Sequence, residues 1–169
     1  MRVSFAFALC LMAAPAVASM AEALSMEEMC DSAERIAVAR VEGATARYDS
    51  RGRIVTDYAL AVDEGLKGCS AGDSLELTTF GGRIGDLAMQ IAGSPQLVVG
   101  SRYVVFAQER AARLRPVGMS QGTMPIVDQP GEVPIVRQGG QGLDLVGRRQ
   151  GPPGQPLPEL IERIRTIVQ

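Results

Sequence analysis

Residues 54–107 contain three apolar runs, IVTDYALAV (54–62), SLELTTF (74–80) and RYVVFA (102–107). Each run is short and rich in β-branched or aromatic residues, a composition typical of β-strands. Glycine-rich segments separate the runs, as turns between strands require. This stretch therefore predicts an all-β fold in which strands follow one another closely along the chain.

The alternation within these runs predicts which side chains are buried. Tyr58, Leu60 and Val62 share one face of a strand, because successive side chains of a strand point to opposite faces. The run from 103 to 106 is apolar on both faces, which is typical of a central strand. Continued alternation assigns further residues to the core: Leu75, Leu77, Leu87, Met89 and Ile91.

The segment from Phe80 to Gly85 follows a strand and contains three glycines. It lacks the G-x-G-x-x-G spacing of a dinucleotide-binding loop, and the residues after it alternate like a strand. We therefore interpret it as a tight hairpin or a bulge.

The N-terminal flank begins with residues 19–24, which we expect to form a loose tail. Ser25 and Glu28 then have the spacing of a capping box, which predicts a short helix over 26–33. A strand over 36–42 follows.

Three further strands are expected after residue 107, over 113–117, 124–127 and 133–137. The first two contain proline, which places them at edges or strand ends.

The C-terminal flank consists of a linker and a helix. Residues 138–156 are rich in Gly, Pro, Gln and Arg and predict an extended linker with a short apolar contact at 143–146. Residues 157–169 predict an amphipathic helix that packs on the barrel. Its apolar side chains recur at helical spacing: Leu157, Leu160, Ile161, Ile164, Ile167 and Val168.

Residues 1–18 have the pattern of a secretory signal peptide, with cleavage after Ala18 or, as second choice, after Ala21. We expect a periplasmic or secreted protein with no transmembrane segment after cleavage. The mature chain then comprises a barrel domain (19–137), the linker (138–156) and the C-terminal helix. Short strands at regular spacing predict a small closed or partly open OB-like antiparallel barrel.

Two cysteines, Cys30 and Cys69, remain after cleavage at either site. Because export places them in an oxidising compartment, we expect them to form a disulfide.

The composition argues against several classes of chemistry. The formal net charge is −2, which does not favour nucleic acid, and the chain contains no histidine. A Ser-His-Asp or Cys-His site is therefore impossible. Lys67 with Ser70, or the carboxylates Asp57 and Asp63, are the remaining catalytic candidates. Their positions in strands and turns indicate solvated surface residues, so we expect no catalytic residues, no metal site and no cofactor.

The segment GMSQGTM, residues 118–124, places two methionines around a small polar loop. Methionine adapts to irregular surfaces, so Met119, Ser120, Gln121 and Met124 are a candidate partner-contact loop. A plain hairpin turn is the competing interpretation.

Several short motifs resemble the netrin-like family, which includes the tissue inhibitors of metalloproteinases. They are Cys30 at the start of the domain, AVARVEG at 37–43, V-x-x-x-LKG at 62–68 and G-x-x-YVVF at 100–106. The resemblance implies an OB-type barrel that binds proteins. In the inhibitors a mature N-terminal cysteine chelates zinc, whereas Cys30 lies inside this chain and the usual six cysteines are reduced to two. The inhibitory mechanism is therefore not carried over.

Together these observations predict an exported, non-enzymatic β-barrel module that binds an unknown protein or envelope partner, with inhibitor-like action as one form of that binding. The alternative is an envelope enzyme of unknown reaction that uses carboxylates or Ser70 with Lys67.

Overall fold

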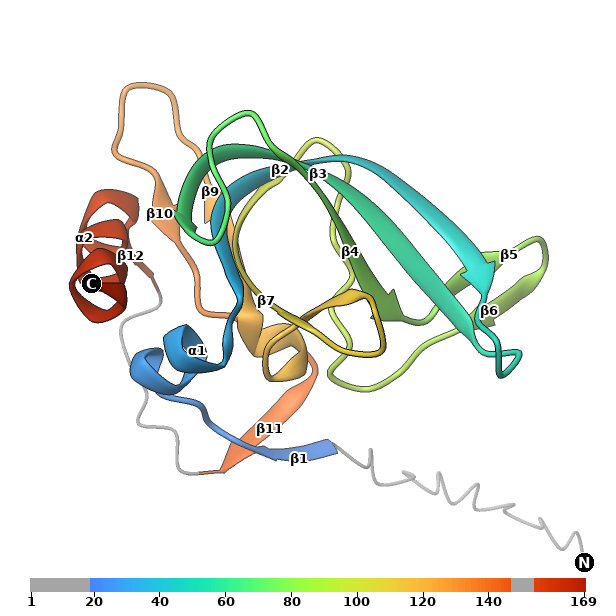
Figure 1. Ribbon diagram of the computed structural model, residues 1–169. Coiled ribbons are helices and arrows are strands. Elements are labelled where there is room, and N and C mark those ends of the chain that lie inside the picture. Colours follow the sequence, from blue (N-terminus) through green and yellow to red (C-terminus); the bar gives the residue numbers. More distant parts are fainter. Residues whose placement is uncertain (1–18, 147–153) are drawn as a thin grey trace, which may run out of the picture.

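The computed structural model describes residues 19–146 and 154–169. The described part of the chain is mostly β-strand, with a closed five-stranded barrel and two α-helices, as the sequence predicts (Figure 1). The predicted signal peptide and part of the predicted linker lie outside the described residues.

The barrel consists of β2, β3, β4, β7 and β8. Strands β2 (Arg35–Tyr48) and β3 (Ile54–Lys67) form a long antiparallel ribbon, and β4 (Ser74–Phe80) pairs with β3. Strand β7 (Arg102–Glu109) pairs with the first part of β2. Strand β8 (Leu114–Pro116) closes the barrel because it pairs with both β7 and β4.

Further strands extend or flank the barrel. Strands β9 (Thr123–Val127), β10 (Ile135–Val136) and β12 (Gln155–Pro156) continue the sheet outward from β7. Strands β5 (Gly82–Ile84) and β6 (Leu87–Met89) form the predicted hairpin, which projects at the far end of the β2–β3 ribbon (Figure 1).

Glycine is required where that hairpin leaves β4. Gly82 has a φ of +134°, and a Cβ there would lie 2.3 Å from the Thr56 hydroxyl oxygen. That hydroxyl donates a hydrogen bond to the Gly81 carbonyl at 2.7 Å, which holds the turn against β3.

The helices α1 (Met26–Ser32) and α2 (Leu157–Val168) lie on the same side of the molecule (Figure 1). The predicted capping box begins α1, with Ser25 and Glu28 bonded reciprocally. The predicted apolar face of α2 is buried through Leu157, Leu160, Ile161 and Ile164. The helix therefore packs on the chain's own sheet and on α1, as expected.

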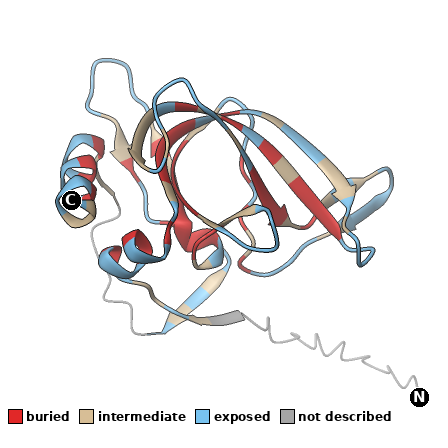
Figure 2. Cartoon of the chain, in the orientation of Figure 1, coloured by how far each residue is buried: buried red, intermediate tan, exposed pale blue. Residues whose placement is uncertain are grey.

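Buried residues occur along β2 and β7 and on both helices (Figure 2), and their side chains form two clusters on opposite faces of β2 and β7. We call the first the barrel interior; it contains Tyr58, Leu60, Val62, Leu77 and Val105 among others. The second, the helix layer, lies between the outer face of the sheet and α1 and α2. Its members include Ile36, Val38, Phe106, Leu160 and Ile164.

Three expectations about the chain's organisation were wrong. Residues 19–22 form β1 (Ser19–Glu22), not a loose tail, because they pair in parallel with β11 (Leu143–Val146). Within residues 138–156 the expected apolar contact at 143–146 is β11, but β12 is a second strand where only a linker was expected. Leu87 is 63% exposed, because the β5–β6 hairpin projects away from the barrel and its side chains meet no covering layer, and Ile91, in the loop after β6, is 38% exposed.

Candidate functional site

The predicted partner-contact loop is a 3-10 helix, η1 (Met119–Gly122), followed by β9. Of its four candidate residues Met119 is exposed (38%), whereas Ser120, Gln121 and Met124 are buried. Met119 has a φ of +61°, a left-handed conformation that is uncommon for a residue with a side chain. Most of this loop therefore faces the protein and not the solvent.

The buried residues of η1 hold distant parts of the chain together. The Gln121 side chain accepts a hydrogen bond from the Leu24 N–H at 2.9 Å and donates one to the Glu22 carbonyl at 3.0 Å. The Ser120 hydroxyl donates to the Gln141 carbonyl at 2.9 Å. These contacts dock the N-terminal segment and the 138–146 segment on the barrel.

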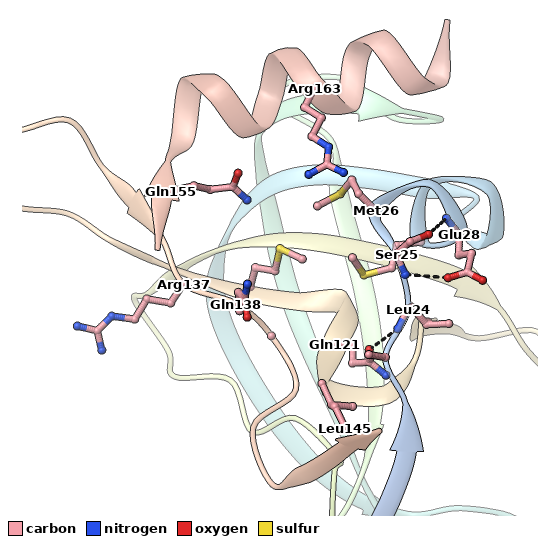
Figure 3. A pocket seen from close by; sticks show the side chains of 14 residues that line it. Leu24, Ser25, Met26, Glu28, Gln121, Arg137, Gln138, Leu145, Gln155 and Arg163 are labelled. Atoms are coloured by element: carbon pink, nitrogen blue, oxygen red, sulfur yellow. Dashed lines mark hydrogen bonds between the residues drawn. The ribbon is translucent and has the colours of Figure 1, made fainter. Parts of the chain in front are cut away.

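Docking of the N-terminal segment leaves a pocket of about 730 Å³ between α1, η1, β11 and α2 (Figure 3). Such a volume is within the range of ligand-binding sites. Apolar side chains from α1 and its N-terminal flank, from β9 and from β11 line it: Leu24, Met26, Met29, Met124 and Leu145. Because three of these are methionines, the wall can adapt to the shape of an apolar ligand.

Most polar side chains around this pocket are held by bonds within the protein. Arg163 extends from α2 toward Met26 and donates to the Glu27 carboxylate at 3.1 Å (Figure 3). The Ser25 backbone N–H donates to the Glu28 carboxylate at 2.7 Å, and this bond lowers the pKa of Glu28. Together with the bonds of Gln121, these contacts make the polar rim a set of structural links. Arg137, also on the rim, forms no ion pair within the described residues.

A second pocket, of about 430 Å³, lies beside the loop 90–98. Two tyrosines of the barrel hold this loop: the hydroxyl of Tyr58 accepts from the Leu97 N–H at 3.2 Å, and that of Tyr103 accepts from the Val98 N–H at 3.0 Å. The sequence assigned Tyr58 to the core correctly, but a bond to a segment 39 residues away leaves no local signal.

The predicted disulfide between Cys30 and Cys69 is not present, and both cysteines are free thiols. Cys30 belongs to the helix layer, whereas Cys69 packs against the barrel interior, so the two lie in clusters on opposite faces of β2. Burial raises the pKa of both thiols. A raised pKa lowers the thiolate fraction and hence the reactivity of each cysteine.

The candidate catalytic residues occupy structural positions. The Lys67 ammonium donates to the Cys30 carbonyl at 2.7 Å, so it links the end of β3 to α1. Ser70 is exposed, and its backbone N–H donates to the Asp73 carboxylate at 2.8 Å. The Asp63 carboxylate pairs with Arg102 at 3.0 Å.

Asp57 is the most enclosed of the candidate carboxylates. Partial burial by itself would raise its pKa, but hydrogen bonds from Arg47 and Thr78 outweigh this effect, and the net pKa lies below the usual value. Asp57 is therefore an ionised partner of Arg47 at neutral pH and is poorly suited to act as a proton donor.

Within residues 19–146 and 154–169, no three acidic or cysteine side chains gather closely enough to hold a metal ion. No helix in these two ranges has the length and apolar character needed to cross a membrane.

Comparisons with protein-family models, with curated proteins and with solved structures gave no match.

Proposed function

We propose that this protein is an exported, non-enzymatic binding module that captures an apolar segment of another protein in the periplasm or outside the cell. In this proposal the barrel is the scaffold, and the pocket between α1, η1, β11 and α2 is the binding site. The observation that carries it is the methionine-lined wall of this pocket, formed by Met26, Met29 and Met124.

The chemistry of the pocket favours binding over turnover. Its most prominent polar groups, those of Ser25, Glu28, Gln121 and Arg163, are bonded within the protein. Catalysis requires an acid, base or nucleophile directed at the substrate. An apolar side chain, in contrast, requires only that water be displaced from an adaptable surface.

Export and the netrin-like resemblance are part of the same proposal. A closed five-stranded barrel is the architecture that the resemblance implies, which supports the assignment. We take the signal cleavage to follow Ala18, because that cut leaves β1 complete, whereas a cut after Ala21 would remove most of it.

A photo-crosslinking experiment tests the proposal. The mature protein, with a photo-crosslinking amino acid at Gln155 on the pocket wall, is incubated with the native envelope fraction and irradiated. The expected result is a discrete adduct with one protein, and the same protein should be recovered at unchanged mass when binding occurs without irradiation. A partner recovered with altered mass would contradict a non-enzymatic role.

Two neighbouring residues of β11 provide a matched pair of variants. Leu145 lines the pocket, whereas Val146 is exposed and does not line it. Leu145→Glu should reduce the adduct at least about tenfold, because a carboxylate in an apolar wall carries a large desolvation cost. Val146→Glu should leave the adduct unchanged. Equal effects of the two variants would exclude this pocket as the binding site.

A further inference from the structure

A narrow slot lies beside the junction of β4 and β8, where the barrel closes. Within the described residues these two strands pair at one position, Leu77 with Leu114, after which β8 continues along β7. Beyond that pair the strands separate and leave this slot, which we call the seam. Its volume is about 80 Å³, and its lining includes Thr79, Phe80, Arg115, Pro116 and Met119.

The size and walls of the seam favour a short aliphatic group. Its surface is almost wholly apolar, with Pro95 and Pro116 contributing rigid walls. An apolar cavity of about 150 Å³ accommodates a benzene ring, so a slot of roughly half that volume suits a branched chain of three or four carbons.

Arg115 places a positive charge at this slot. Its guanidinium carbon lies 4.3 Å from the centroid of the Phe80 ring, and that of Arg53 lies 4.7 Å from the same centroid. Stacking on one aromatic ring orients both guanidinium groups. Arg53 is paired with Asp49 at 2.8 Å, but Arg115 forms no ion pair in the described part of the chain.

The surroundings of Arg115 leave its charge poorly compensated. Burial lowers the pKa of the Arg115 guanidinium, and the nearby charge of Arg53 lowers it further. Two acids act electrostatically on Arg115, Asp49 and Asp57. Asp49 is hydrogen-bonded to Arg53, and Asp57 is hydrogen-bonded to Arg47. A carboxylate at the edge of the seam, with its aliphatic part in the slot, would therefore meet a partly desolvated guanidinium whose planar fork matches it.

We propose that the seam binds a carboxylate carried on a short branched aliphatic group, with Arg115 pairing with the carboxylate and the slot enclosing the aliphatic part. Such a group occurs in a free short-chain acid and in the C-terminal residue of a polypeptide. This site is independent of the proposed partner-binding pocket, since the two share no lining residue.

Amide-resolved NMR titration of the mature protein with isovalerate tests the proposal. We expect saturable shifts in residues 78–80 and at the Arg115 side chain, with a dissociation constant on the order of millimolar for so small a ligand. Isovaleramide, which has the same shape without the charge, should bind at least tenfold more weakly. Equal binding of the acid and the amide would overturn the proposal.

Three variants distinguish the contribution of the Arg115 charge to isovalerate binding from the contribution of the apolar slot. Arg115→Gln should weaken isovalerate binding at least tenfold, and Arg83→Gln, at an exposed position on β5, should not change it. Met119→Trp should also abolish binding, because it fills the slot while Arg115 remains. Circular dichroism and the amide spectrum confirm that each variant is folded. Unchanged binding in Arg115→Gln, or an equal loss in Arg83→Gln, would show that the seam is not the site.

Two further ligands define the occupant. Benzoate should bind more weakly than isovalerate, and tighter binding of benzoate would contradict the proposed slot. A dipeptide ending in valine with a free C-terminus is compared with isovalerate: stronger binding of the dipeptide identifies a polypeptide C-terminus as the preferred form, and weaker binding identifies the free acid.

Discussion

The barrel interior and the helix layer share the strands β2 and β7 but are built differently. The barrel interior is enclosed by strands, and its packed side chains are aliphatic and tyrosine residues such as Tyr58, Leu60 and Tyr103. The helix layer is covered by two helices that begin 131 residues apart in the sequence, at Met26 and Leu157. It also contains three methionines, Met26, Met29 and Met124.

This difference assigns separate roles to the two faces of one sheet. Backbone hydrogen bonds around the barrel hold its interior in one arrangement. The helix layer depends on side-chain packing and on a few ion pairs, such as Arg163 with Glu27 and Arg165 with Glu64. The pocket of about 730 Å³ borders the helix layer, so the proposed partner would contact the covering elements and not the barrel interior.

The largest expected effect is in the barrel interior. Leu60 is 1% exposed, and Leu60→Ala should lower the free energy of unfolding by about 4 kcal/mol, because strands on every side prevent collapse of the cavity. Urea denaturation followed by circular dichroism measures the loss. The exposed Val133 provides a control, since Val133→Ala should change stability by less than about 0.5 kcal/mol. If Leu60→Ala lowers the free energy of unfolding no more than Val133→Ala does, the barrel interior is not the rigid scaffold of the protein.

The helix layer should respond more locally. Leu160 is fully buried on α2, and Leu160→Ala should cost about 2–3 kcal/mol, since the helix can shift to close part of the cavity. Hydrogen exchange should show lost protection in α2 while β2, β3 and β7 keep theirs. Equal loss of protection in α2 and the barrel strands would mean that the two regions are one cooperative unit.

The difference between the two regions also explains how much the sequence could predict. The barrel strands were evident because alternation is a local property; β4 spans Ser74–Phe80 as expected. The helices were also predictable, since the capping box and the apolar spacing of α2 lie within one turn or a few turns.

Contacts between distant segments were not predictable. No local pattern indicates that residues 19–22 pair with β11, about 120 residues later, or that Gln121 bonds to Leu24. Alternation also wrongly assigned Leu87 and Ile91 to the core. An alternating pattern indicates which side chains share one face of a strand, but not whether another part of the protein covers that face. The pocket and the seam both depend on such long-range arrangement, which is why the sequence predicted neither.

The outer face of β3 and β4 around Asp57 allows a smaller test. The pKa of Asp57 is lower in the folded state than the value of about 3.9 in an unfolded chain. Asp57 should therefore stabilise the fold above that pH, and this contribution should disappear as the pH falls through the lowered value.

Comparison of wild type with Asp57→Asn by urea denaturation at several pH values measures the contribution of Asp57. The difference in the free energy of unfolding between the two proteins should be largest near neutral pH and should shrink toward pH 2. The exposed Asp86 is the control, and Asp86→Asn should have little effect at any pH. A difference that grows on acidification would reverse the sign and contradict the Arg47–Asp57–Thr78 network.

The smallest expected effect is at the start of α1, where the helix layer adjoins the pocket. The Ser25 hydroxyl accepts from the Glu28 N–H at 3.1 Å, and Ser25→Ala should cost about 1 kcal/mol. Ser25→Asp, which restores an acceptor at this position, should recover most of the loss. If α1 covers the barrel without stabilising it, amide hydrogen exchange in Ser25→Ala should accelerate in α1 and near Leu24. The amide of Val105 in the barrel interior should stay protected. Faster exchange at Val105 would instead show that the barrel relies on its cover, and the division of roles between the two faces would fail.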